Sequence, residues 1–212
     1  MTRRRIRCGF AESREEREQV YRLRYECYHR EGFVDPAADR QFSDRFDVQL
    51  NSFSFLARGA AEEPLASVRI SVVKPDLGWT DSPVRHMFGD NPLFHSGSPL
   101  TFVEASRLCF ARQVRRDSFV QLLGNVAALA EFFRAEWLVA CPRIEHARTY
   151  ERLFGFQRLS APRRCFGVSF ETVLLGVRMT DLADHVRNSQ PMLDAWSGAL
   201  AAMREIGLNL DA

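Results

Sequence analysis

The strongest constraint on the fold is the order of four patterns in the middle of the chain. Residues 101–110 (TFVEASRLCF) are predicted to be a strand, and residues 137–142 (WLVACP) have the short, continuous apolar run of a central, buried strand. A strongly apolar helix pattern separates these two strands, and a second helix pattern ends at Gly155. Two further strands are predicted earlier, at residues 52–58 and 64–73. Strands first, then alternating helix and strand, predict an α+β fold with a mixed central sheet flanked by helices.

The length of 212 residues suits one ample domain better than two. Ser13 followed by Glu16 has the spacing of a capping box, so a helix is predicted to start there. Residues 75–100 contain four prolines and are predicted to form a long irregular connection, of the kind that often makes the lid or wall of a functional site. We expect a single domain over residues 1–212, with residues 180–212 as a C-terminal helical extension.

The composition excludes several classes of protein. Hydrophobic residues make up 46% of the chain and charged residues 26%, which argues against disorder, and a net charge of +2 is too small to indicate nucleic-acid binding. Five scattered cysteines without a CxxC pair fit reduced, mostly buried thiols better than disulfides or a metal site. There is no run of 18 apolar residues and no pattern of a signal peptide. We therefore expect no metal, no transmembrane segment and a cytoplasmic location.

Two charged residues stand out in the strand at residues 101–110, which is otherwise rich in apolar residues. Glu104 and Arg107 lie in its middle, three residues apart. Burying either charge alone costs several kcal/mol, so each is expected to have a partner or a function. In a regular strand the two side chains would point to opposite faces, because the side-chain period is two.

Several motifs carry a resemblance to a known superfamily. The order of the later elements and the segment YERLFGF, residues 150–156, resemble the GNAT acyltransferase fold. The segments VYRLRYECYHREGF, SDRFD, ASVRIS and VEASRL follow one another between residues 20 and 108. In this order they resemble the autoinducer-synthase branch of that superfamily, which holds the acyl-homoserine-lactone synthases and the N-acyl amino acid synthases of the FeeM type. The resemblance covers residue 13 to about residue 177.

The resemblance implies a formally neutral cluster of three arginines and three carboxylates. Glu104 and Arg107 would be its catalytic members: Glu104 is the first candidate for the general base, and Arg107 is a candidate for binding a carboxylate. A purely structural role for Glu104 remains open. The resemblance also implies a β-bulge, which we expect near Ala105 or Ser106, so that both side chains reach one side. The substrate-binding members would be Arg24, Asp44, Asp47 and Arg69.

One departure from the branch favours the amino acid synthases. After Arg69 the chain continues Ile-Ser-Val-Val, where homoserine-lactone synthases are expected to have a Leu-Leu-Pro-Thr-like run. The implied function is an N-acyltransferase that moves a long-chain fatty acyl group from an acyl-carrier-protein thioester to the α-amine of an amino acid, giving N-acyl amino acids. The alternatives are an acyl-homoserine-lactone synthase using S-adenosylmethionine, or a non-catalytic relative that binds acyl chains or carrier protein.

The donor is inferred from the turn at residues 113–118 (QVRRDS). It lacks the glycines whose amides would cradle the pyrophosphate of coenzyme A, so the phosphopantetheine arm of acyl-carrier protein fits better as the donor, with no bound cofactor. Carrier proteins are acidic, so a basic patch is expected to dock them; a solvated turn is the alternative. The candidate docking residues are Arg112, Arg115 and Arg116. The candidate residues of an acyl pocket, which could equally be core residues, are Phe102, Phe110 and Phe119.

Overall fold

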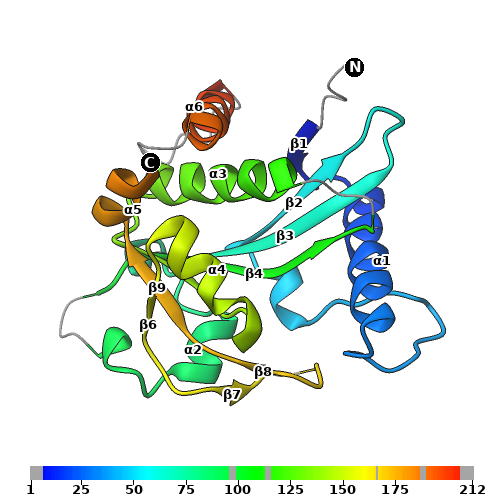
Figure 1. The fold of residues 1–212 in the computed structure, drawn as a ribbon, viewed down its shortest axis with the longest axis horizontal. Helices are drawn as coiled ribbons and strands as arrows, with labels where there is room; N and C mark the ends of the chain where they lie inside the picture. Colours follow the sequence, from blue (N-terminus) through cyan, green and yellow to red (C-terminus); the bar gives the residue numbers. More distant parts are fainter. Residues whose placement is uncertain (1–6, 96–98, 113–115, 166, 187–189, 206–212) are drawn as a thin grey trace.

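The computed structural model describes residues 7–95, 99–112, 116–165, 167–186 and 190–205 (Figure 1). Its main sheet has seven strands in the order β1-β2-β3-β4-β5-β9-β6, and every neighbouring pair is antiparallel except β4 and β5, which are parallel. The predicted α+β fold with a mixed sheet is confirmed. The strands are β1 (Arg7–Phe10), β2 (Ser52–Arg58), β3 (Pro64–Val73), β4 (Phe102–Phe110), β5 (Trp137–Ala140), β9 (Leu175–Arg178) and β6 (Gln157–Arg158). A separate two-stranded ribbon pairs β7 (Arg163–Arg164) with β8 (Glu171–Thr172).

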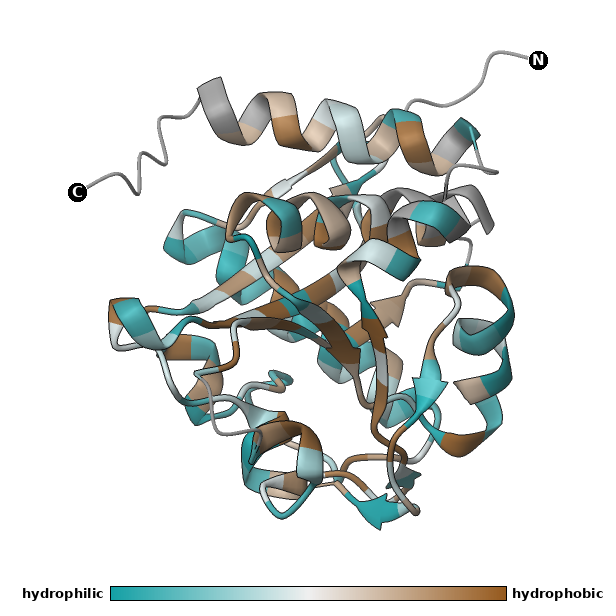
Figure 2. Cartoon of the chain, turned by 90° about the vertical axis from the view of Figure 1, so that its left-hand side faces the viewer, coloured by the Kyte–Doolittle hydropathy of each residue, from teal (hydrophilic) through white to brown (hydrophobic). Residues whose placement is uncertain are grey.

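One face of the sheet is covered by helix α3 (Arg116–Phe132), and α6 (Gln190–Glu205) lies against the outer side of α3 (Figure 1). Alternate strand residues such as Phe55, Val68 and Val103 point to α3 and form the largest apolar cluster with it. In Figure 2 the strands in the middle of the molecule are accordingly coloured as hydrophobic. No helix in the described ranges is long and apolar enough to cross a membrane.

The opposite face is covered by two separate helices. Helix α1 (Arg14–Arg30) begins with the predicted Ser13–Glu16 capping box and packs Val20, Leu23 and Cys27 against Leu56 and Cys109. Helix α2 (Pro83–Phe88) packs against the other half of the sheet through Val84 and Phe88. Between these apolar clusters the same face carries buried polar residues, all at most 1% exposed: Ser67, Arg69, Ser71 and Glu104.

Strands β4 and β5 pair over only part of their length. Their register runs from Phe102 opposite Trp137 to Ala105 opposite Ala140, after which the chain leaves β5 for helix α4 (Ile144–Phe154). The remainder of β4 continues to Phe110 and therefore has no β5 partner. Helix α4 ends at Gly155, as predicted, where a φ of +70° favours glycine.

The predicted β-bulge in β4 is present, but it begins one residue after the expected positions. Arg69 of β3 lies opposite Ser106, whereas Ser67 lies opposite Cys109, so both Arg107 and Leu108 face the single residue between them on β3. Arg107 has a φ of +54°, a left-handed conformation that non-glycine residues seldom adopt. The bulge changes which β4 side chains reach the face shared by α1 and α2.

The loop after α1 contains the short 3-10 helix η1 (Arg45–Val48). The connection at residues 75–100, which was predicted to be long and irregular, is only partly irregular. Ser82 and Pro83 start α2 there, as N-cap and first helical residue, which is a sequence signal that the proline count obscured. The remaining elements are η2 (Pro75–Leu77), η3 (Pro92–Phe94) and, after β9, α5 (Met179–Val186).

Candidate active site

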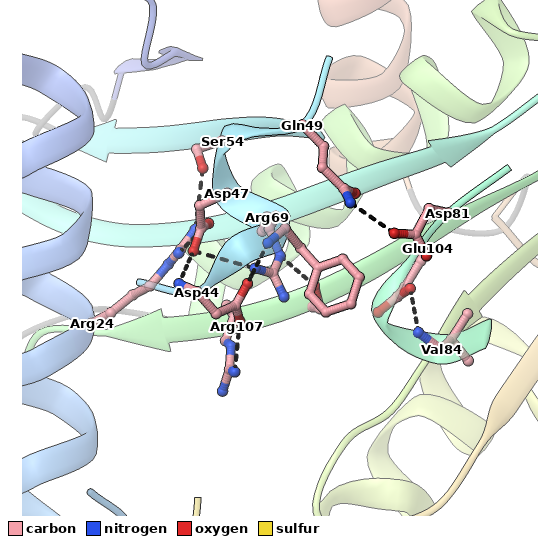
Figure 3. Close-up of polar contacts among 12 residues, drawn as sticks. Arg24, Asp44, Asp47, Gln49, Ser54, Arg69, Asp81, Val84, Glu104 and Arg107 are labelled. Carbon is pink, nitrogen blue, oxygen red and sulfur yellow. Dashed lines mark hydrogen bonds and ion pairs between the residues drawn. The ribbon is translucent and has the colours of Figure 1, made fainter. Parts of the chain in front are cut away.

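Five charged side chains form one alternating chain of ion pairs, which we call the ion-pair chain (Figure 3). Asp47 lies between Arg24, at 2.6 Å, and Arg69, at 3.3 Å. Asp44 lies between Arg69, at 2.5 Å, and Arg107, at 2.8 Å. Three guanidinium groups and two carboxylates give the chain a net charge of +1.

The two carboxylates are placed by the start of η1. Asp44 is its N-cap and accepts a hydrogen bond from the backbone N–H of Phe46, while Asp47 accepts one from the backbone N–H of Asp44. This reciprocal capping fixes both carboxylates on one short turn, where arginines from α1, β3 and β4 reach them. The SDRFD segment is thus both a helix start and half of the ion-pair chain.

Burial and two arginines have opposite effects on the pKa of Asp44. Burial alone would raise the pKa of its carboxyl, but the charges and hydrogen bonds of Arg69 and Arg107 lower the pKa to about 2. Asp44 therefore stays ionised at any physiological pH. The side chains of Arg24, Asp47 and Arg69 are at most 1% exposed, so the inner part of the ion-pair chain is shielded from solvent.

Glu104 stands apart from the ion-pair chain, on the α2 side of the site (Figure 3). One oxygen of its carboxyl accepts a hydrogen bond from the backbone N–H of Val84 at 2.9 Å, and the other is buried without a partner in the described ranges. No ion pair joins it to an arginine in that part of the chain, although Arg69 is close enough to act on it electrostatically. The sequence-based expectation of one neutral cluster of six is therefore corrected to a cationic chain of five plus a separate carboxyl.

Burial is the main influence on the titration of Glu104. The residue is 0% exposed, and burial raises the pKa of its carboxyl to about 7, against the opposing effects of the Val84 amide, Arg69 and Ser82. Near neutral pH the carboxyl therefore exists in both protonation states. A group with such a pKa can accept a proton in one step and release it in another.

Two cavities open on either side of this part of β4. The α2-side cavity, of about 500 Å³, is lined by Asp44, Arg69 and Glu104 together with apolar side chains of which Phe42, Phe46 and Met87 are examples. The α4-side cavity, of about 720 Å³, lies where β4 and β5 diverge and is lined by residues 105–110 and by α4. The residues that line both cavities are Tyr28, Ser106, Arg107, Cys141 and Phe170.

This arrangement can bring two ligands together at one strand segment. A ligand in the α2-side cavity would meet the cationic ion-pair chain and a titrating carboxyl, and a ligand in the α4-side cavity would reach the same point from the other side. Ser106 and Arg107 stand at the junction. Group transfer between two bound molecules is the chemistry that such a geometry supports.

The structure separates the residues that were expected to bind substrate. Asp44 and Arg69 line the α2-side cavity, whereas Arg24 and Asp47 line neither of the two cavities at the junction. Arg24 instead donates to Ser54 and Asp47 and stacks on Tyr21. Through these contacts Arg24 and Asp47 join η1 to α1, and their predicted role in substrate binding stays a prediction.

The predicted acyl-pocket residues also divide. Phe110 and Phe119 line the α4-side cavity and lie 5.9 Å apart, ring centroid to ring centroid. Phe102 lines neither cavity: it is 1% exposed and packs in the apolar cluster under α2, next to Phe94. Phe102 is a core residue because its end of β4 is covered by α2 and η3.

The candidate docking residues are only partly described. Arg112 is exposed just after β4. Arg115 lies outside the described residues, and so does the rest of the first half of the glycine-free turn, residues 113–115. Arg116 is the first residue of α3, and its side chain is not described. Other arginines, which no sequence motif singled out, line the α4-side cavity: Arg30, Arg143 and Arg152.

Tyr150 is a further residue whose position sequence reasoning did not exploit. It lies on α4, lines the α4-side cavity and contacts Phe119 edge to face. Burial raises the pKa of its phenol, so the hydroxyl stays protonated. The signal was present in the YERLFGF motif, of which Tyr150 is the first residue.

Comparisons with known proteins show which family and which folds this chain resembles. A family model described as N-acyl amino acid synthase FeeM matches residues 19–178. The solved structure of FeeM, an N-acyl amino acid synthase from uncultured soil microbes, is 13% identical, with a TM-score of 0.72 over 86% of this chain and 95% of that chain. The CoA-dependent acyl-homoserine lactone synthase BjaI is 19% identical, with a TM-score of 0.59 over 92% and 98%. A putative N-acetyltransferase from Lactobacillus plantarum is 14% identical, with a TM-score of 0.57 over 82% and 98%. No curated protein gives a match.

Proposed function

Because the chain belongs to the FeeM family of N-acyl amino acid synthases, and is thereby an acyltransferase, we propose that it joins a long-chain fatty acyl group to the α-amine of an amino acid. The acyl donor in this proposal is the thioester of an acyl-carrier protein. The observation that carries the proposal is the junction of the two cavities at the β4 bulge, which Glu104 approaches from the α2 side.

The charges around the α2-side cavity suit an α-amino acid as acceptor. The ion-pair chain carries one surplus positive charge and ends at Arg107, so a carboxylate placed beside it would balance the charge. Glu104 has a pKa of about 7, and within the described residues one of its oxygens has no hydrogen-bond partner, so it can take a proton from the ammonium group, directly or through water. A carboxylate and an ammonium on one carbon thus have complementary partners.

The proposed reaction proceeds in two steps. Once Glu104 has removed a proton, the amine nitrogen attacks the thioester carbon and a tetrahedral oxyanion forms. The attacking nitrogen, which now carries a positive charge, releases a second proton to water. The oxyanion then collapses, the C–S bond breaks, and the thiolate leaves with its electron pair. Tyr150, neutral and in the α4-side cavity, is placed to protonate that thiolate.

The α4-side cavity suits the donor. Its apolar lining includes Leu108, Phe110 and Phe119, which can pack against an acyl chain. Arg30, Arg143 and Arg152 line the same cavity and can attract the phosphate of a phosphopantetheine arm or the acidic surface of its carrier protein. We keep Arg112, Arg115 and Arg116 as additional docking candidates because they follow directly on β4.

The test is turnover by the purified protein. It would be incubated with acyl-carrier protein loaded with a long-chain acyl group and a mixture of the twenty amino acids, and products would be identified by intact mass. We expect masses equal to a fatty acid plus an amino acid minus water, and strongly reduced formation by Glu104→Gln. Acyl-coenzyme A replaces the carrier protein in a parallel reaction, and equal or faster turnover there would overturn the choice of donor.

Two results would contradict the proposed acceptor or the proposed catalysis. Lactones formed only when S-adenosylmethionine is added would identify an acyl-homoserine-lactone synthase. Tight binding of acyl-carrier protein without turnover of any amine would identify a non-catalytic binding protein.

A further inference from the structure

Ser106 occupies the junction of the two cavities from the centre of β4. It lies two residues after Glu104, and therefore on the same face of the strand, and directly before the bulge at Arg107. Its cross-strand neighbour on β3 is Arg69, which brings the two side chains side by side. It is one of the few residues that line both cavities.

The hydroxyl of Ser106 is held by a buried cation. The Nε–H of Arg69 donates a hydrogen bond to the Ser106 oxygen at 3.1 Å. Arg69 is itself fixed by ion pairs to Asp44 and Asp47 and is 1% exposed, so this donor cannot move away without breaking the ion-pair chain. The guanidinium therefore sets the position of the serine oxygen.

That hydrogen bond uses the oxygen of Ser106 and leaves its proton available. A hydroxyl can accept hydrogen bonds and donate one, and no side chain or carbonyl in the described ranges accepts the proton of Ser106. Accepting a hydrogen bond from a cation also polarises the O–H bond, which makes the hydroxyl a stronger donor. The hydroxyl of Ser106 can therefore donate this hydrogen bond at the place where the two ligands would meet.

The other residues that line both cavities are less suited to this task. Phe170 has no donor, the Cys141 thiol is a weak one, and Arg107 is held by Asp44. Tyr28 carries a neutral hydroxyl, but it stands on α1, and in the described ranges no cation donates a hydrogen bond to it. Ser106 alone combines a polarised hydroxyl with a place beside Glu104.

We propose that the Ser106 hydroxyl donates a hydrogen bond to the oxyanion of the tetrahedral intermediate, with Arg69 as the residue that positions and polarises it. The inference rests on the proposed function. When the amine nitrogen bonds to the carbonyl carbon, the C=O electron pair moves to oxygen, and the Ser106 proton stabilises that charge without being transferred. When the C–S bond breaks, the pair returns and the hydrogen bond weakens. This makes Ser106 a catalytic residue in addition to Glu104.

The experiment compares four proteins in steady-state acyl transfer from acyl-carrier protein: the wild type, Ser106→Ala, Ser106→Thr and Ser67→Ala. Ser67 is the matched control, because it is a buried serine on the same face of β3 that lines neither cavity and bonds Cys109 instead. We expect Ser106→Ala to lower kcat about 100-fold with KM for both substrates nearly unchanged. Ser106→Thr, which keeps the hydroxyl, should recover most of kcat, and Ser67→Ala should resemble the wild type.

The outcomes separate this inference from the proposed function. If the wild type turns over and Ser106→Ala does so at the same rate, the proposed role of Ser106 is overturned. The acyltransferase function would stand, and backbone amides at the bulge would hold the oxyanion. A rise in KM without a fall in kcat would likewise reduce Ser106 to substrate binding. Wild-type protein without turnover of any amine would overturn both. Circular dichroism of each variant checks folding, and Ser106→Cys, close in size but a weak donor, replaces Ser106→Ala if that variant does not fold.

Discussion

Glu104 and Arg107 lie three residues apart on β4, yet both line the α2-side cavity, because Arg107 opens the β-bulge with a φ of +54°. The bulge places an extra residue between regular strand positions, so a side chain that should point to α3 points to the site instead. The left-handed conformation costs about 1 kcal/mol or more, and the ion pair of Arg107 with Asp44 offsets part of it. The approach of Arg107 to the face that carries Glu104 therefore depends on one backbone irregularity.

The first prediction concerns the pH dependence of turnover. Glu104 must be ionised to accept a proton, and its pKa is about 7, so kcat/KM should fall as the pH drops below 7. Glu104→Gln should lower kcat by about 100-fold or more and remove this acid limb from the profile. The measurement is kcat/KM between pH 5.5 and 9. A variant that keeps both the rate and the limb would mean that another group is the base.

The carboxyl of Glu104 should also affect the stability of the fold. Whereas turnover should fall at low pH, stability should be higher there. Its folded-state pKa is raised, so the folded protein binds more protons than the unfolded chain between pH 4.5 and 7, and stability decreases as the pH rises through that window. The loss amounts to about 2 to 3 kcal/mol between pH 5 and 8. Urea unfolding of the wild type and of Glu104→Gln at both pH values measures it. Relative to the wild type, the free energy of unfolding of Glu104→Gln should be higher at pH 8 than at pH 5. An equal difference between the two proteins at both pH values would contradict the raised pKa.

Asp44 should show the reverse dependence. Its pKa is lowered to about 2, so its contribution to stability is full above its unfolded value near 3.8 and is lost as the pH falls towards 2. Asp44→Asn removes the carboxylate between Arg69 and Arg107 and should cost about 3 kcal/mol at pH 7. Urea unfolding at pH 7 and pH 3 should show that difference shrinking at the lower pH.

A matched control exists on the surface. Asp90 forms a bidentate pair with Arg163, but the pair is exposed to solvent. Asp90→Asn should leave unfolding at pH 7 almost unchanged, because exposed ion pairs contribute little. If Asp44→Asn and Asp90→Asn lowered the free energy of unfolding by the same amount, the stabilising effect of the ion-pair chain would not result from its burial.

The general fold could be predicted because its determinants are local. The order of strand and helix patterns gave the mixed sheet, Ser13 and Glu16 marked the start of α1, and Gly155 marked the end of α4. Each of these depends on residues close together in the sequence, where propensity and capping decide the outcome. The family motifs could also be recognised in the sequence, because each is short and they follow one another in a fixed order.

The detail of the site depended on contacts between distant segments. The isolation of Glu104 from the arginines follows from the amide of Val84, on a helix that the prolines of residues 75–100 concealed. The displacement of Phe102 into the core has the same cause, because α2 and η3 cover that end of β4. The position of the bulge is set by how β4 pairs with β3, and a strand sequence alone does not fix its register.

Tyr150 gives a prediction about the leaving group. Its phenol is neutral and lines the α4-side cavity, so Tyr150→Phe should lower kcat with an acyl thioester by about 100-fold while KM stays nearly constant. Tyr21→Phe is the matched control, since Tyr21 lines neither cavity at the junction. A donor whose leaving thiol is more acidic, such as an acyl thiophenol, should narrow the difference between wild type and Tyr150→Phe. An unchanged difference would show that Tyr150 does not protonate the thiolate.

The last prediction concerns the length of the acyl chain. Phe119 lines the α4-side cavity and packs against Phe110, Tyr150 and Phe154, so its ring limits the space beside β4. Phe119→Ala should shift the preference in kcat/KM towards longer acyl chains, and Phe119→Trp should shift it towards shorter ones. The measurement is competition among carrier proteins loaded with acyl groups of increasing length, read by product mass. Phe102→Leu, which repacks a core position outside both cavities, should leave the ratio of products unchanged. Opposite shifts from the two Phe119 variants are required, because lost stability alone would reduce all products in the same proportion.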